Sequence, residues 1–228
     1  MSNLPSDLVS TGTATFQWVA ERTIHPVRGM RLGLTDTLLP SDVDAAKKRY
    51  EQFGGLAFAE ALDPRFLDQI QQLCDTGQFV SDTAEPGHRE VESPQRAGRA
   101  LNLVLSRSPV LRWLETVTGA GPLREIAGRV VQTLPRPGDE LCWHDDRPES
   151  GGEDDRRLAI VINIGAQSFE GGQFEMRRKA GEVLLQHQHT QAGSMLVFRV
   201  DRDLEHRVLP LTAGGPRRVY TGWAMGAS

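Results

Sequence analysis

Short apolar runs and turn residues alternate through the second half of the chain, and this pattern predicts a β-rich domain. Within the runs, apolar and polar residues tend to alternate, which is typical of strands that bury one face. We expect strands near residues 128–134, 140–146, 157–165, 173–178, 183–188, 194–199, 206–211 and 217–224. Eight strands of this length suit a jelly roll, in which two sheets enclose a common interior.

The first half of the chain shows helical spacing instead. Ser41-Asp42 precedes an apolar-periodic stretch over residues 43–53. Asp63-Pro64 combines an N-cap with a proline in the first turn, and Ser108-Pro109 opens another helix in a similar way. The predicted fold class is therefore mainly β with α, a double-stranded β-helix (jelly roll) buttressed by N-terminal helices.

The chain is expected to consist of an arm and one domain. Residues 1–40 carry no clear period and are interpreted as an N-terminal arm. Residues 41–228 are long enough for a single domain, with helical support over 41–125 and the jelly-roll core over 126–225. The polar stretch 81–98 is expected to be a long loop, and such loops often form lids or binding elements.

Charge and composition argue against several classes of partner. The formal net charge is -4 and the sequence pI is about 5.9, so no basic footprint for nucleic acid is expected. No apolar run approaches the ~20 residues that a membrane helix needs, and no secretory signal is expected. Cys74 and Cys142 make no disulfide framework and are interpreted as small core residues. A reducing cytoplasm is the expected location.

Three residues have the chemistry of a metal site. His144 and Asp146 form an H-x-D at the end of an expected strand, and alternation points both side chains the same way. His206 supplies a second imidazole at the expected start of a later strand. Two histidines and one carboxylate can occupy one face of an octahedral metal and leave the opposite face open, as in the facial triad of non-haem Fe(II) oxygenases.

The segments around these residues add an ordered pattern, which matters because an H-x-D alone is common by chance. The pattern consists of the H-x-D, an apolar strand ending at Asn163, the pair Gly171-Gly172, the run 193–198, His206 before an apolar stretch with a proline, and Arg217 ahead of Trp223. In order and spacing, residues from about 125 to 225 resemble the 2-oxoglutarate and Fe(II)-dependent dioxygenases, in particular the branch that looks like prolyl 4-hydroxylase.

The resemblance implies an enzyme. It assigns His144, Asp146 and His206 as ligands of Fe(II). It assigns Arg217 as the partner of the distal carboxylate of 2-oxoglutarate, which is a cosubstrate together with O2. The implied reaction hydroxylates an unactivated C–H bond of an amino acid, a peptide or another small metabolite, and releases succinate and CO2. A carboxylate at the ligand position favours hydroxylation over halogenation, while desaturation and cyclisation stay open as alternatives.

One departure from the family pattern concerns the arginine. The spacing after His206 is one residue longer than in the family, so Arg218 is a rival for the carboxylate anchor. We prefer Arg217, because strand alternation puts it on the same face as Trp223, which matches the family's spacing. A guanidinium fork in this position suits bidentate capture of a carboxylate.

A second departure concerns the other contact to the cosubstrate. The family often carries tyrosines in the strand before the H-x-D, and one of them reaches 2-oxoglutarate. The corresponding stretch 130–134 has no tyrosine. Gln132, Thr133 and Asn163 are the candidates that remain for this contact.

Other polar clusters have two interpretations each. His187 and His189 could form a rival metal pair of the cupin kind, but the hydrophilic run around them favours surface exposure. The run Arg177-Arg178-Lys179 is interpreted as a solvated hairpin in preference to an anchor for an anionic substrate. The basic residues that could favour an acidic substrate are Arg147, Arg156 and Arg157.

Two competing functions would use the same residues. A non-catalytic metal- or ligand-binding jelly roll of the cupin type would keep the barrel without turnover. An oxygen- or iron-sensing protein would couple the site to a regulated partner. The presence of all three ligands and the arginine favours the enzyme. Substrate contacts are expected from the loop 81–98, the stretch 147–156 and the arm, because substrate recognition varies with loops, and the oligomeric state is open.

Overall fold

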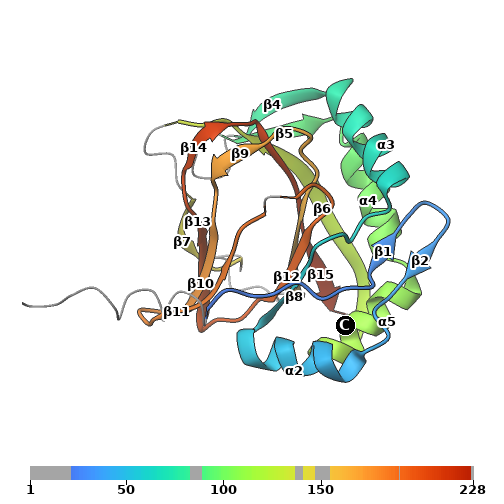
Figure 1. Ribbon diagram of the computed structural model, residues 1–228, viewed down its shortest axis with the longest axis vertical. Helices are drawn as coiled ribbons and strands as arrows, with labels where there is room; N and C mark the ends of the chain where they lie inside the picture. The colour runs from blue at the N-terminus through green and yellow to red at the C-terminus, as the bar shows by residue number, and fades with distance from the viewer. Residues whose placement is uncertain (1–21, 83–88, 137–140, 147–154, 190, 227–228) are drawn as a thin grey trace, which may run out of the picture.

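Two antiparallel sheets face each other and enclose the interior of a barrel (Figure 1). The computed structural model describes residues 22–82, 89–136, 141–146, 155–189 and 191–226. Inward-facing side chains of both sheets form one apolar cluster, with Leu196 and Phe198 from the larger sheet and Phe174 and Met176 from the smaller. The prediction of a mainly β jelly roll with supporting helices is confirmed.

The larger sheet consists of β3 (Gly55–Phe58), β4 (Gln78–Asp82), β5 (Arg89–Ser93), β6 (Leu123–Thr133), β8 (Arg156–Asn163), β12 (Met195–Arg199) and β15 (Arg217–Gly226). Its strand order is β3-β12-β8-β15-β6-β5-β4. The smaller sheet consists of β7 (Leu141–His144), β10 (Phe174–Arg178), β11 (Val183–His187) and β13 (Leu204–Val208), in the order β11-β10-β13-β7. Two short antiparallel pairs are β1 (Arg31–Leu32) with β2 (Thr37–Leu38), and β9 (Phe169–Gly171) with β14 (Leu211–Gly214).

Helices lie against the outer face of the larger sheet (Figure 1). They are α2 (Val43–Phe53), α3 (Pro64–Asp75), α4 (Arg96–Leu105) and α5 (Ser108–Thr118). Two of the expected starts are capped as the sequence predicts, because Asp42 accepts a hydrogen bond from Ala45 N at 2.9 Å and Asp63 accepts one from Arg65 N at 3.0 Å. Among the described residues, no helix has the length and apolar character needed to cross a bilayer.

Strand alternation separates the two faces of the larger sheet. On β15, Tyr220 and Ala224 pack in the cluster that faces the helices, whereas Trp223 packs against the cluster inside the barrel. Arg217 has the parity of Trp223, so it points into the barrel. The interior is therefore mostly apolar, and a charged side chain buried inside it costs free energy unless a partner compensates its charge.

The register of the strands brings distant residues together. On the smaller sheet, β13 pairs with β7 so that His206 and His144 are Cα partners. On the larger sheet, β15 pairs with β6 so that Arg217 lies opposite Thr133. Residues separated by more than sixty positions in the chain therefore become neighbours across a strand pair.

The described part of the predicted arm lies along the barrel. Val27 forms a parallel bridge with Phe58, and Thr23 forms one with Gln186. Residues 1–21 lie outside the described residues.

The expectation of a loop over residues 81–98 is wrong for the described part of that stretch. β4 and β5 form an antiparallel hairpin in which Val80 lies opposite Val91, and α4 already begins at Arg96. The hairpin extends the larger sheet beyond β6. Its strands are rich in polar residues because most of their side chains are only partly buried, so no apolar run marks them.

Glu92 connects this hairpin to the helix that follows it. The side chain is only 1% exposed, and its carboxylate accepts hydrogen bonds from the backbone N–H groups of Arg96 at 3.0 Å, Ala97 at 2.8 Å and Gly98 at 3.1 Å. Gln95, at the N-cap position of α4, makes no side-chain capping bond. Glu92 therefore satisfies the free N–H groups of the first turn from outside the helix, where negative charge is also favoured.

Loss of this carboxylate is expected to destabilise the fold. We expect Glu92→Ala to lower the free energy of unfolding by about 3 kcal/mol, because three backbone N–H groups lose their acceptor in a buried place. Glu92→Gln keeps one oxygen acceptor and should lose less. Urea unfolding followed by circular dichroism measures both, with the exposed Glu51→Ala on α2 as the control. An unchanged free energy for Glu92→Ala would contradict the capping role.

Candidate metal centre

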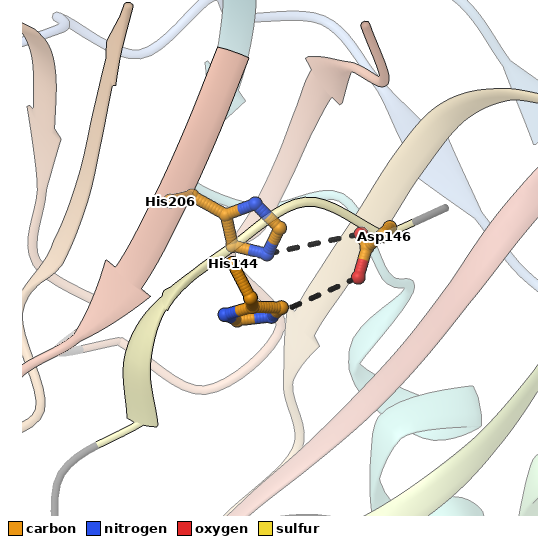
Figure 2. A group of neighbouring side chains, drawn as sticks. All are labelled: His144, Asp146 and His206. Carbon is orange, nitrogen blue, oxygen red and sulfur yellow. Dashed lines mark ion pairs between the residues drawn. The ribbon is translucent and has the colours of Figure 1, made fainter. Parts of the chain in front are cut away.

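His144, Asp146 and His206 converge on the inner side of the smaller sheet (Figure 2). His144 is the last residue of β7, and Asp146 follows two residues later. His206 lies in the middle of β13 and not at its start as the sequence suggested. The side chains of His206 and His144 nevertheless meet, because the two residues are partners across the strand pair.

The potential ligand atoms form a tight group. Nε2 of His144 lies 3.8 Å from Oδ1 of Asp146, and Nε2 of His206 lies 3.7 Å from Oδ2. All three ligand atoms lie within 4.8 Å of one another. The nitrogen–oxygen distances are longer than hydrogen bonds, so the donor atoms leave room between them for a shared cation.

The orientation of His144 is set by the backbone of its own strand. Nδ1 of His144 lies 2.8 Å from the carbonyl oxygen of Cys142. A carbonyl oxygen only accepts, so Nδ1 carries a ring proton, and Nε2 is the nitrogen that can offer a lone pair to a metal. Metal-binding histidines are commonly oriented by a hydrogen bond of this kind.

His206 is held by aromatic packing. Its ring stacks on Phe174 at 5.5 Å between centroids and meets the edge of Phe198 at 4.8 Å. Burial lowers the pKa of His206 to about 4, although the nearby Asp146 acts in the opposite direction. The imidazole is therefore neutral at physiological pH, which is the state that can bind a metal.

The loop that carries Asp146 is fixed from two sides. Arg156 on β8 donates a hydrogen bond to the backbone carbonyl of Asp146, and its guanidinium lies 4.1 Å from the ring centroid of Trp223. On the other side, Lys179 forms an ion pair with Asp145 at 2.8 Å. Arg156 thus links the larger sheet to the residue that offers the carboxylate.

Arg156 is therefore expected to position Asp146. We expect Arg156→Ala to weaken Fe(II) or Mn(II) binding about 10-fold, since groups that orient metal ligands typically contribute this much. Metal titration by calorimetry under anaerobic conditions measures the change. Arg157→Ala, at the exposed neighbouring position on β8, is the matched control. Equal metal affinity in the two variants would show that Arg156 does not position the ligand.

Arg217 lies in the barrel without a counter-charge. It is 6% exposed, and among the described residues no partner is found for its Nε and no carboxylate pairs with its guanidinium. Burial, with a smaller contribution from the charge of Arg89, lowers the pKa of Arg217 to about 10, so the side chain stays charged at neutral pH. Gly172 makes room for it, since a Cβ there would lie 3.3 Å from Cδ of Arg217.

Arg218, the rival anchor, faces away from the barrel. Its guanidinium forms an ion pair with Asp75 on α3 and donates to Oε1 of Gln132 at 3.0 Å. Gln132 also bonds to Glu90. The side chains of Arg218 and Gln132 thus bond each other on the helix side of the sheet. Neither side chain points into the barrel, where Arg217 lies.

The other two candidates for a second cosubstrate contact differ from each other. Thr133 lies opposite Arg217 in the register of β6 and β15. Asn163 is engaged by the backbone, because its Nδ2 donates to the carbonyl of His189 at 3.2 Å and its Oδ1 accepts from Gly165 N at 3.1 Å. Of the sequence candidates, Thr133 is the direct cross-strand partner of the arginine.

The expectation that His187 and His189 are exposed is wrong. They are 8% and 0% exposed, with ring centroids 4.4 Å apart. Gln186 and Gln188 take the outward positions of this polar run, which places the histidines on the inner side with Leu185. No metal-binding group that includes them is found among the described residues, so a cupin-like pair is not supported.

The two cysteines and the remaining arginines named in the sequence analysis have these outcomes. Cys74 is buried as expected, which raises the pKa of its thiol to about 12, whereas Cys142 is exposed and the prediction of a core position was wrong. Arg177 forms an ion pair with Glu205 at 2.6 Å. Arg147, one of the basic residues considered for substrate binding, lies outside the described residues together with 148–154.

A comparison with protein families accounts for this arrangement. Residues 129–225 match the family model described as the 2OG-Fe(II) oxygenase superfamily. Over these residues, the jelly roll corresponds to a 2OG-Fe(II) oxygenase domain. The matched residues of the oxygenase domain include the three converging side chains and Arg217. The predicted class of enzyme and its predicted use of Fe(II) and 2-oxoglutarate are confirmed.

Solved structures share the fold of the oxygenase domain. A prolyl-4-hydroxylase from Pseudomonas putida superposes with a TM-score of 0.59 at 19% identity, covering 82% of this chain and 100% of that one. A prolyl hydroxylase from Trichoplax adhaerens, in complex with a hypoxia inducible factor peptide fragment, gives 0.60 at 17% identity, covering 80% and 88%. The epimerase SnoN with Fe3+, alpha ketoglutarate and nogalamycin RO gives 0.58 at 14% identity, covering 83% and 85%. No match emerged among curated proteins.

The residues present in the oxygenase domain fit the metal that the family uses. Two imidazole nitrogens and one carboxylate oxygen are the donor set of the facial triad. Nε2 of His144 faces the other two donor atoms, and His206 is neutral. His144, Asp146 and His206 would therefore hold Fe(II).

Proposed function

We propose that the chain is an Fe(II)- and 2-oxoglutarate-dependent hydroxylase whose ligands are His144, Asp146 and His206 and whose cosubstrate anchor is Arg217. The observation that carries the proposal is the convergence of two histidines and an aspartate in a barrel that also contains a buried arginine, for which the described residues offer no counter-charge. A metal-binding jelly roll without an acidic cosubstrate would have no use for that arginine, since a buried unpaired cation costs stability.

Each of the four residues has a role that follows from its surroundings. His144 and His206 donate Nε2 lone pairs, and Asp146 adds the negative charge that favours a divalent cation. Arg217 offers a planar fork that binds the distal carboxylate of 2-oxoglutarate in two places. The apolar side chains of Phe174 and Phe198 beside His206 exclude water from that side of the site.

Bound Fe(II), with 2-oxoglutarate and O2, supplies the oxidising power that converts a C–H bond to an alcohol while succinate and CO2 are released. The contribution of the chain is to orient the three ligands, to hold the cosubstrate at the arginine and to keep the interior dry. A rigid β scaffold suits this task because the ligands must converge within a fraction of an ångström. We regard residues 41–228 as one domain built for it.

The substrate class is proposed more broadly. Among proteins of this fold, one relative carries a peptide fragment in its structure and another carries nogalamycin RO. Hydroxylation of an amino acid, a peptide or another small metabolite is consistent with this range. Arg156 is engaged with Asp146 and Trp223, so the sequence-based case for an acidic substrate loses one of its three arginines.

The proposal is tested on metal-stripped protein under anaerobic conditions. Fe(II) is added first and 2-oxoglutarate second, and the visible metal-to-ligand charge-transfer band of the chelated cosubstrate is recorded. Admission of O2 should then give succinate in an amount that depends on both additions. We expect the band and the succinate in the wild-type protein, and substrate screening follows by succinate release with amino acids and peptides.

The controls separate an enzyme from a binding protein. Omission of 2-oxoglutarate or replacement of Fe(II) by Zn(II) should remove both signals. A band without succinate under O2, across the substrate screen, would indicate a ligand-binding or sensing protein. Absence of the band in folded protein would refute the proposed site itself.

A further inference from the structure

Beside Arg217, the barrel contains two buried imidazoles that have no role in the metal site. His187 ends β11, and His189 follows it two residues later. Within the described residues, Nε2 of His187, Nε2 of His189 and Nε of Arg217 have no hydrogen-bond partner. Buried polar atoms are nearly always paired in folded proteins, so three such atoms in one region indicate a ligand that completes them.

The three side chains approach one another from opposite sheets. His187 is the Cα partner of Phe174, which lies inside the barrel on β10. Arg217 reaches from β15 toward the same strand, because Gly172, two residues before Phe174, lies against its Cδ. The charge of Arg217 is one of the causes that lower the pKa of His189. The three side chains therefore extend toward the same part of the barrel interior.

The polarity of this region suits one carboxylate. Burial lowers the pKa of His187 to about 4, and burial, followed by the neighbouring His187 and Arg217, lowers that of His189. Both rings are thus neutral at physiological pH, and Arg217 carries the one positive charge among these three side chains. A carboxylate balances that charge.

The contact of His189 with Ser194 is compatible with a donor role for Nε2. Its Nδ1 lies 3.4 Å from Oγ of Ser194. With the serine hydroxyl donating, the ring proton is on Nε2, which then points an N–H group into the pocket. Asn163 holds the backbone of His189 through the carbonyl oxygen at 3.2 Å, so the position of the ring is supported.

We propose that His187 and His189 complete the binding pocket for the distal carboxylate of the cosubstrate, alongside Arg217. This inference rests on the proposed function. It supplies the second contact that the absence of a tyrosine in the stretch 130–134 leaves open. The pair acts as neutral donors that determine cosubstrate specificity, and the histidines do not touch the reacting atoms.

The test measures binding and does not depend on turnover. Zn(II)-loaded protein is titrated by calorimetry with 2-oxoglutarate, which has the distal carboxylate, and with oxalate, which chelates the metal but lacks that carboxylate. We expect His187→Leu and His189→Leu each to raise the Kd for 2-oxoglutarate about 10-fold, because a hydrogen bond to a charged group is lost. The Kd for oxalate should stay the same.

Conservative variants distinguish a donor role from packing. His187→Gln and His189→Gln keep a side-chain N–H close to the place of Nε2 and should recover most of the affinity for 2-oxoglutarate. Unchanged 2-oxoglutarate affinity in the folded leucine variants would overturn the inference. So would a parallel loss of oxalate affinity, because that result indicates general damage. Failure of the wild-type protein to bind 2-oxoglutarate would instead refute the proposed function, which distinguishes the two.

Discussion

His206→Ala is expected to abolish turnover and to weaken Fe(II) binding by more than about 100-fold. Groups that merely orient metal ligands typically contribute 10- to 100-fold, so the loss of a ligand should exceed that range. His206 is also the most enclosed of the three ligands, between Phe174 and Phe198, so water cannot readily take its place. Anaerobic metal titration and the charge-transfer band with 2-oxoglutarate measure the effect.

A histidine outside the site provides the control for this variant. His25 is exposed, and its backbone carbonyl accepts a hydrogen bond from the side chain of Arg49. His25→Ala should therefore bind Fe(II) and 2-oxoglutarate like the wild-type protein. If His206→Ala kept the band at the same Fe(II) concentration, the triad would be misassigned.

Arg217→Met should raise the Kd for 2-oxoglutarate on the order of 100-fold without lowering the stability of the metal-free protein. Truncation of one partner of a buried charged pair typically costs 2–5 kcal/mol of binding, and each 1.4 kcal/mol is about tenfold. In the absence of cosubstrate, no counter-charge for the buried arginine is found in the described part of the chain, so an apolar residue of similar length should be tolerated or stabilising. Calorimetric titration and thermal unfolding measure the two quantities.

The neighbouring arginine is the matched control. Arg218 lies on the opposite face of β15 and pairs with Asp75 and Gln132. Arg218→Met should leave the Kd for 2-oxoglutarate unchanged and lower the melting temperature slightly. The reverse pattern, with affinity lost in Arg218→Met and kept in Arg217→Met, would show that the rival residue is the anchor.

Strands that bury one face were predictable because apolar and polar residues alternate along them. The stretch expected over 217–224 became β15, and the same alternation assigned Arg217 to the interior. The convergence of His144 with His206 follows from the register of β7 on β13. The ordered motif predicted that convergence through the family resemblance, since local pattern alone does not encode which strands pair.

The polar elements were missed because their burial depends on partners far along the chain. Glu92 is buried because its carboxylate accepts hydrogen bonds from backbone N–H groups of α4. The sequence around Glu92 contains no pattern that predicts this burial. His187 and His189 gave a clearer signal, since alternation from the apolar Leu185 assigns both to the inner side. The sequence-based interpretation relied on the hydrophilic composition of that run and not on its alternation. For polar residues that line a binding pocket, alternation is the better predictor of which side chains are buried.

Because β7 is an edge strand, a metal bound at its end would stabilise the pairing of β7 with β13. Among the described strands, β7 is the last of the smaller sheet and is hydrogen-bonded there to β13 alone, while Asp146 lies two residues beyond its end. A cation held by His144, Asp146 and His206 would cross-link the tip of this edge strand to its neighbour. By linkage, metal at 100 times its Kd would add about 2.7 kcal/mol against any opening that separates the two strands. Fraying of the sheet edge and loss of the metal would then be coupled, and the supply of iron would influence how firmly the barrel is closed.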